Sequence, residues 1–251
     1  MNICISAETT VDLTPELLEE YDIRTIPFGL TMGEEAGLDG QIKPEDLFEY
    51  TKKTGQLPRT SAVNVSNEDE FKGKVDIIDS RSLSTGIALH CLYARKLARA
   101  GKEPKDIVEA VKARIPYGQA SFSLESVNYL YKGGRCSMLQ MLGANVLGLK
   151  PEIFVKEGKM VSGAKYRGPM KKVVMEYVED TLKLFPNADK EEVFITYSTA
   201  PEEVLATVQA RLEKEGFKHI HQTRAGATIS CHCGPHCLGI LYINDGPHPI
   251  A

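Results

Sequence analysis

The residues with the most evident chemistry lie near the end of the chain, where Cys231 to Cys237 reads Cys-His-Cys-Gly-Pro-His-Cys. This stretch holds three of the six cysteines and two of the six histidines. Thiolates and imidazoles are preferred zinc ligands, but a structural site generally takes four, often from two separated pairs, and no second pair occurs here. On a strand, Cys231 and Cys233 would face one way and His232 the other, so one ion could not bind all three without a turn. We therefore predict no bound metal and keep a metal- or redox-binding protein as the alternative.

A pair of adjacent hydroxyls, Thr60 and Ser61, follows Pro58 in a stretch that we predict to be extended. Proline removes a backbone donor and keeps its predecessor out of the helical region. Two hydroxyls beside open backbone amides can hydrogen-bond a carboxylate or a phosphate without bringing a full positive charge. The competing interpretation is a helix cap, because Ser66 and Asn67 stand just before an acidic run.

A second hydroxyl cluster, Ser84-Thr85-Gly86, begins a predicted helix. It follows Asp79 and Ser80, which lie at the carboxyl end of a short strand predicted over 75–78. Ligands of open α/β sheets collect at the carboxyl ends of strands, and a helix amino terminus offers unpaired N–H groups to an anion. A plain cap competes again, but two such clusters in one half of the chain favour a polar pocket.

Motifs of the common enzyme classes are weak in this chain. It has no phosphate loop of the Walker kind and no clear glycine-rich dinucleotide fingerprint, and Gly133-Gly134-Arg135 alone indicates a helix stop with a solvated arginine. A serine hydrolase would need a base such as His232 beside Ser61 or Ser84, and no nucleophile-elbow pattern surrounds either serine.

An alternation of strands and helices must position these residues. In the first half it predicts a parallel α/β sheet, because strands and amphipathic helices take turns along the chain. The predicted strands there are 3–6, 23–30, 75–78 and 121–124, and the helices start at Thr14-Pro15, Pro44, Ser84, near 107, at 127 and at 137, the last ending at 147. After Pro151 the pattern changes to a mixed-sheet α+β arrangement. It consists of a hairpin over 152–165, helices over 169–184 and 202–214, and strands over 193–197, 219–223 and 238–243.

Length and composition bound the remaining possibilities. At 251 residues two domains are expected, and we place their boundary near residue 148, giving units 1–148 and 149–251. The net charge of -4 argues against a general binder of nucleic acid or anionic membranes. No apolar run approaches the roughly 18 residues that span a bilayer, and no basic leader precedes the first strand, so we expect a cytoplasmic protein without stable membrane insertion. Cys4, Cys91 and Cys136 stand in apolar contexts typical of reduced thiols.

These pieces, in this order, resemble the DegV family of bacterial fatty-acid-binding proteins. The resemblance covers almost the entire chain, and its closing motif, His232-Cys233-Gly234-Pro235, is similar to the family's His-x-Gly-Pro-Gly. The other matching stretches are Ser6 to Leu13 (family Asp-Ser-Thr-x-Asp-Leu), Thr60-Ser61 (Thr-Ser-Gln-Pro), Asp79-Ser80 through Ser84 to Gly86 (Asp-Ser-x-x-x-Ser-x-Gly), Tyr129-Leu130, Lys132 to Arg135, Leu149 to Pro151, Gly158-Lys159 and Lys165 to Arg167.

The resemblance implies a two-domain α/β protein that encloses one long-chain fatty acid of the palmitate, stearate or oleate type. The tail would lie in a tunnel of the amino-terminal domain, and the carboxylate would lie between the domains. Characterised members are non-enzymatic carrier subunits of a fatty acid kinase, which present the carboxylate to a separate ATP-binding subunit. The residues that the pattern implies are Thr60, Ser61, Ser84, Thr85 and His232 for the carboxylate, Gly86, Gly234 and Pro235 for the pocket backbone, and Arg167 for the partner or the acyl phosphate.

The chain also departs from the family pattern. Glu8-Thr9 stands where the family has Asp-Ser, and Ala62-Val63 stands where it has Gln-Pro. His236 replaces the second glycine of Gly-Pro-Gly, so a bulky titratable side chain occupies a position where the backbone normally turns freely. Neither this histidine nor the thiols of Cys231, Cys233 and Cys237 receive a role from the resemblance.

Overall fold

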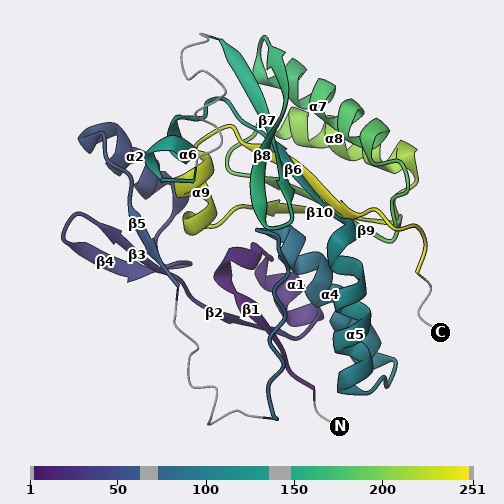
Figure 1. The fold of residues 1–251 in the computed structure, drawn as a ribbon. Helices are drawn as coiled ribbons and strands as arrows, with labels where there is room; N and C mark the ends of the chain where they lie inside the picture. Colours follow the sequence, from purple (N-terminus) through teal and green to yellow (C-terminus); the bar gives the residue numbers. More distant parts are fainter. Residues whose placement is uncertain (1–2, 63–72, 136–147, 249–251) are drawn as a thin grey trace.

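A six-stranded mixed sheet forms the centre of the molecule (Figure 1). The computed structural model describes residues 3–62, 73–135 and 148–248, so the helix predicted over 137–147 lies outside the described residues. The strand order is β10-β9-β11-β6-β7-β8, with β9 and β10 parallel and the other pairs antiparallel. The strands are β6 (Gly118–Ser123), β7 (Leu149–Lys156), β8 (Lys159–Arg167), β9 (Glu192–Tyr197), β10 (His219–Arg224) and β11 (Leu238–Ile243).

Helices cover both faces of this sheet because its central strands are apolar on both sides. All six residues of β11 are buried. Ile240 packs with α7 (Met170–Leu184) and α8 (Glu202–Glu215), whereas Leu241 packs with α4 (Thr85–Arg99) on the opposite face. This division follows from the two-residue period of a strand. The α/β fold class predicted from the sequence is confirmed. The mixed sheet predicted after Pro151 also includes β6 from the first half, which pairs antiparallel with β11 and β7, so the parallel sheet found in the described first half consists of two strands, over 5–8 and 23–26.

The predicted domain boundary falls between two paired strands. β6 precedes residue 148 and β7 follows it, and Ser121 pairs with Phe154 across the two. Strands from both sides of residue 148 therefore belong to one sheet. The division into units 1–148 and 149–251 stays a prediction.

Two smaller sheets lie on the amino-terminal side of the molecule. β1 (Ile5–Glu8) and β2 (Ile23–Ile26) are parallel and are joined through η1 (Thr9–Val11) and α1 (Pro15–Glu20), whose first turn is capped by the Thr14 hydroxyl. The three-stranded antiparallel sheet has the order β4-β3-β5. Its strands are β3 (Gly29–Met32), β4 (Glu35–Leu38) and β5 (Arg59–Ser61), and the remaining helices are α2 (Pro44–Thr54), α5 (Pro104–Arg114), η2 (Ile115–Tyr117), α6 (Asn128–Lys132) and α9 (Ala227–Cys233).

The strand predicted over 75–78 is wrong. These residues have no strand partner among the described residues, and Val75 and Ile77 are 54% and 67% exposed. Ile78 packs instead with the core between α4 and α5. A short apolar run can belong to a connection whose single buried side chain packs on helices, and its periodicity alone does not reveal this. Asp79 and Ser80 consequently follow a loop rather than the end of a strand.

No helix in the described part of the chain is both long and apolar enough to cross a membrane.

Tyr177 joins α7 to two strands of the large sheet and generates a stability prediction. Its fully buried hydroxyl donates to the Ser121 carbonyl at 2.8 Å and accepts from the Ile240 N–H at 3.0 Å. Tyr177→Phe removes both contacts, so the free energy of unfolding in urea should fall by roughly 1–3 kcal/mol. The control is Tyr117→Phe, at a half-exposed ring, which should change it by less than about 0.5 kcal/mol. Equal stability of the two variants would contradict the prediction.

Candidate ligand-binding site

A cavity of about 190 Å³ lies against the large sheet beside α6 and α9. Its wall is almost entirely apolar and adjoins the buried cluster around Phe122 and Leu130. The side chains on its wall include those of Leu83, Ser84, Met160, Ile229, His232 and Cys233. An apolar space with a few convergent polar groups is the usual form of a small-molecule site.

The cysteine-rich stretch is helical where it adjoins this cavity. α9 spans Ala227–Cys233, so the strand geometry considered for residues 231 and 233 is wrong. The helix forms because carboxylates from distant segments cap its first turn: Asp12 accepts the Gly226 N–H at 2.8 Å, and Asp39 accepts the Ala227 N–H at 3.0 Å. Capping of this kind satisfies donors that have no partner within a helix.

The thiols of this stretch point to different surroundings. Cys231 packs with Leu30 and Leu47, whereas Cys233 and Cys237 pack with the cluster that borders the cavity. All three cysteines are free and buried. Burial raises the pKa of Cys231 to about 12, and the hydrogen bond with Cys237 together with burial raises that of Cys233, so both thiols are neutral at pH 7. Across the described residues no three His, Cys, Asp or Glu side chains gather where they could hold a metal ion.

His232 lies on the cavity wall and contacts Thr60, one of the hydroxyl residues predicted to bind the carboxylate. Its Nε2 lies 3.2 Å from the Thr60 Oγ1 on β5. Its Nδ1 is buried and has no hydrogen-bond partner in the described structure. Burial, reinforced by the nearby Arg135 guanidinium, lowers the pKa of His232 to about 4. Gly133 makes room for the ring, because a Cβ there would lie 2.6 Å from Nδ1.

Ser84 also lines the cavity, in a strained backbone conformation. It is 3% exposed and has φ +51° and ψ −139°, a region that residues with a side chain rarely adopt. Its hydroxyl donates to the Asp12 Oδ2 at 2.5 Å. The hydrogen bonds therefore pair Ser84 with a carboxylate and His232 with Thr60, and they do not form the serine–histidine pair that a hydrolase needs.

Other predicted residues lie away from the cavity wall. The Thr85 hydroxyl faces the sheet, 2.6 Å from that of Thr196. Ser61 is exposed at the end of β5, and Arg167 is exposed at the end of β8. Gly86 follows Ser84 in the first turn of α4, where a Cβ would lie 2.1 Å from the Ser82 Oγ. The roles predicted for these residues stay predictions.

The turn that follows α9 places Gly234 and His236 in left-handed backbone conformations. Gly234 has φ +75°, and a Cβ at this position would lie 2.5 Å from the Tyr129 ring. Pro235 is half-buried, and His236 takes φ +57°, the left-handed conformation that glycine adopts most easily. The His236 N–H donates to the Thr199 Oγ1 at 2.9 Å, and its ring is half-exposed. The histidine thus keeps the backbone turn and points its ring to the surface.

Comparison with known proteins identifies the family of this fold. A family model described as "Uncharacterised protein, DegV family" matches residues 2–70 and 65–245. The chain belongs to the DegV family. The resemblance inferred from the sequence motifs is confirmed.

Curated and solved relatives of this DegV chain extend over nearly its whole length. A DegV domain-containing protein of Deinococcus radiodurans is 24% identical over 96% of this chain and 98% of the relative. A Thermus thermophilus DegV family protein, described as binding fatty acid, has a TM-score of 0.87 at 20% identity, covering 97% of this chain and all of its own. The Fatty Acid Kinase (Fak) B3 protein of Streptococcus pneumoniae, solved loaded with linoleic acid, has a TM-score of 0.76 at 17% identity, covering 89% and 92%.

Two residues near the candidate site, Arg135 and Asp12, received no ligand-binding role from the sequence. Arg135 is exposed after the end of α6, as its glycine-rich context indicated, and it also borders the cavity, which the sequence did not predict. Asp12 belongs to the matched motif Ser6 to Leu13, but no role was assigned to it. The motif was the available signal, and the partners of Asp12 lie 72 and 214 residues away in the chain.

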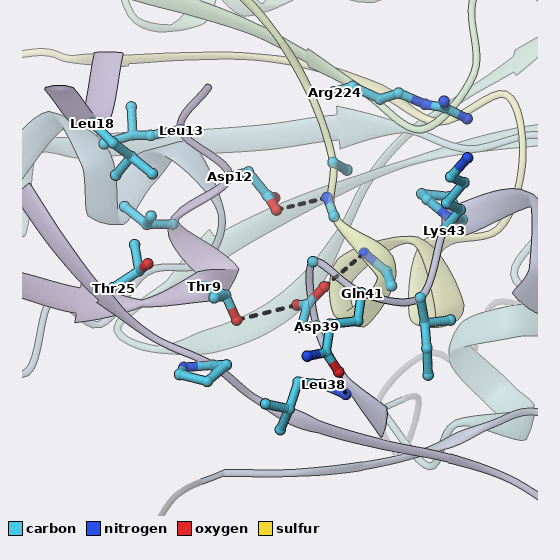
Figure 2. A pocket seen from close by; sticks show the side chains of 18 residues that line it. Thr9, Asp12, Leu13, Leu18, Thr25, Leu38, Asp39, Gln41, Lys43 and Arg224 are labelled. Carbon is cyan, nitrogen blue, oxygen red and sulfur yellow. Dashed lines mark hydrogen bonds between the residues drawn. The ribbon is translucent and has the colours of Figure 1, made fainter. Parts of the chain in front are cut away.

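Asp12 lines a second, larger cavity of about 570 Å³ (Figure 2), and its carboxyl group contacts Ser84 on the wall of the apolar cavity. Figure 2 shows Asp12 and Asp39 at the start of α9, with Lys43 and Arg224 also on the wall. Asp12 is 6% exposed, and burial raises its pKa to about 7 despite the hydrogen bonds from Ser84 and Gly226, with Asp39 adding to the rise. A carboxyl group that changes its charge near neutral pH therefore contacts the serine of the cavity wall.

The lowered pKa of His232 predicts its charge state. The folded chain should keep this imidazole neutral until about pH 4, whereas the unfolded chain protonates it near pH 6.5. Protons then bind preferentially to the unfolded state, so this histidine makes the fold less stable as the pH falls between these values. Nitrogen-15 NMR of the side chain, assigned with a His232→Asn variant, measures the midpoint. A midpoint near 6.5 would show that the ring is solvated.

Proposed function

We propose that this DegV chain binds one long-chain fatty acid, with its tail in the apolar cavity and its carboxylate near Thr60, Ser84 and His232. The observation that carries this proposal is an almost wholly apolar cavity whose wall includes Ser84 and a neutral His232. The descriptions of the solved relatives, one binding fatty acid and one loaded with linoleic acid, support the same ligand class.

Burial of the tail can supply the affinity. About 14 methylenes at about 0.8 kcal/mol each give roughly 11 kcal/mol before the losses of motional freedom are subtracted. The head group then needs only hydrogen bonds, which suits hydroxyls and a neutral imidazole. Neutral donors also leave a carboxylate oxygen nucleophilic enough for phosphorylation.

Entry of a long chain requires side chains to move. A volume of about 190 Å³ is below the roughly 300–1,000 Å³ of ordinary ligand pockets. Leu83, Met160 and Ile229 are only partly buried against the neighbouring core cluster, and methionine adapts readily to new shapes. We infer that these three side chains rearrange to extend the cavity along the tail.

We further propose that the chain is a non-enzymatic carrier that presents the carboxylate to a separate ATP-binding kinase subunit in the cytoplasm. The lack of a nucleotide-binding motif in the sequence supports a phosphoryl donor on another protein. Residues on both sides of position 148, such as Phe122 and Met160, line the cavity, in keeping with two units that enclose one ligand. Arg167, exposed at the end of β8, is the proposed contact with the kinase or the acyl phosphate.

Protein purified from bacteria should carry fatty acid in a ratio of about one per chain, because a buried tail dissociates slowly. Mass spectrometry of the denatured protein against a lipid standard measures this ratio. Empty protein that also takes up neither palmitate nor oleate would exclude the proposed function.

His232→Ala should lower the rate of fatty acid phosphorylation with the cognate kinase about tenfold, equivalent to losing one hydrogen bond of about 1.4 kcal/mol. Tail binding should change much less, because the apolar wall remains. The matched control is His236→Ala on the outward-facing turn, which should leave both the rate and the binding unchanged. An equal loss of phosphorylation and binding in His232→Ala would refute the proposed role of the imidazole.

A further inference from the structure

The hydroxyl of Ser84 has only one proton, and in this structure that proton takes part in a hydrogen bond within the protein. It donates to the Asp12 Oδ2 at 2.5 Å. A serine hydroxyl offers one donor, whereas an ionised carboxylate only accepts. While Asp12 is ionised, Ser84 therefore turns lone pairs toward the cavity that it lines, and these repel a ligand carboxylate.

Protonation of Asp12 reverses this arrangement. An Asp12 O–H at Oδ2 donates to the Ser84 Oγ, and the Ser84 proton is then free to point into the cavity. The other oxygen, Oδ1, still accepts the Gly226 N–H at 2.8 Å, so the cap of α9 is kept. One proton from solvent is consumed and no covalent bond between heavy atoms changes.

We propose that Asp12 is the positioning residue of the carboxylate site: it takes up one proton when a ligand carboxylate binds, and this turns the Ser84 hydroxyl toward the ligand. This inference rests on the proposed function. Two carboxylates that face one hydroxyl in a buried site favour a state in which only one is ionised. A fatty acid ionises with a pKa of about 4 to 5, well below that of the buried Asp12, so Asp12 keeps the proton.

The surroundings of Asp12 fit this role. In the folded chain without ligand, the pKa of Asp12 is about 7, so Asp12 gains a proton at little free-energy cost near neutral pH. The larger cavity of about 570 Å³, which Asp12 lines, gives solvent protons a route to it. Within the described part of the chain, Asp39 after β4 and the Cys233 thiol on α9 interact electrostatically with Asp12, and Lys43 and Arg224 lie on the wall of the same larger cavity.

Two variants separate positioning from capping. Asp12→Asn places a permanent donor beside Ser84 while its carbonyl oxygen can still accept the Gly226 N–H, and asparagine tolerates the left-handed φ of +52° at this position. The variant therefore imitates protonated Asp12 at every pH. Asp39→Asn is the matched control, because Asp39 caps the same helix end through Ala227 and Thr228 and makes no hydrogen bond to Ser84.

The test is titration calorimetry of the full, delipidated chain with decanoate and with 1-decanol between about pH 6 and pH 9. Decanoate affinity should be level below about pH 7 and fall up to tenfold per pH unit above it, with uptake of about one proton measured from buffers of different ionisation enthalpy. Decanol affinity should not depend on pH. Asp12→Asn should bind decanoate equally at all pH values and at least tenfold tighter than the native chain near pH 9. Asp39→Asn should keep the fall and the proton uptake, with the fall beginning at a lower pH because the Asp39 charge that raises the pKa of Asp12 is gone.

Decanoate binding without proton uptake, or uptake that persists in Asp12→Asn, overturns the role of Asp12 while leaving the proposed function intact. Failure of decanoate, palmitate and decanol to bind the native chain overturns both. If Asp12→Asn does not fold, proton uptake by the native chain decides: uptake with decanoate and none with decanol supports the role, and equal values for the two ligands exclude it.

Discussion

The capping of α9 by two carboxylates from the start of the chain is the interaction on which the site depends. The first backbone N–H groups of a helix have no partner within it, and here Asp12 and Asp39 accept those of Gly226 and Ala227. A helix as short as α9 gains little from its own sequence, since helices under about 12 residues are marginal in water. The amino-terminal segment therefore fixes the helix that carries His232, and it also supplies the partner of Ser84.

The thiols on either side of His232 pack in the apolar core, although the concentration of cysteines in the sequence suggests a metal or redox site. Successive helical residues are rotated by about 100°, so Cys231 and Cys233 point in directions about 160° apart. One packs under α2 and the other beside the apolar cavity. Their raised pKa values keep them neutral, and a neutral buried thiol behaves as a small apolar group. The local concentration of cysteine thus serves the wall of the site and its supporting core.

Much of the fold could be predicted from the sequence because its elements have strong local signals. The hairpin β7–β8, the helices α4, α7 and α8, and the buried strand β11 have clear periodicity and breakers at their ends. The prediction failed where tertiary contacts decide: 75–78 is a connection without a strand partner, and α9 is held by residues more than 180 positions away. The motif pattern selected Ser84 and His232, which the fold brings to one cavity. Asp12 lies in the matched motif Ser6 to Leu13, but the motif did not reveal its role, because both of its partners are distant in the chain.

The contacts that compensate the strained backbone of Ser84 also fix the position of this residue. A residue with a side chain keeps φ +51° and ψ −139° only if its surroundings compensate the strain. Here the Ser84 hydroxyl is held by Asp12, and the next residue is fixed to the sheet by the contact between Thr85 and Thr196. Because these contacts hold Ser84 and its neighbour in place, the proposed change is a rotation of the Ser84 O–H bond between two directions, toward Asp12 or toward the cavity. When Asp12 is ionised the Ser84 hydroxyl donates to it, and when Asp12 is protonated the hydroxyl donates toward the cavity. The charge of Asp12, rather than movement of the backbone, therefore decides which groups Ser84 can bind.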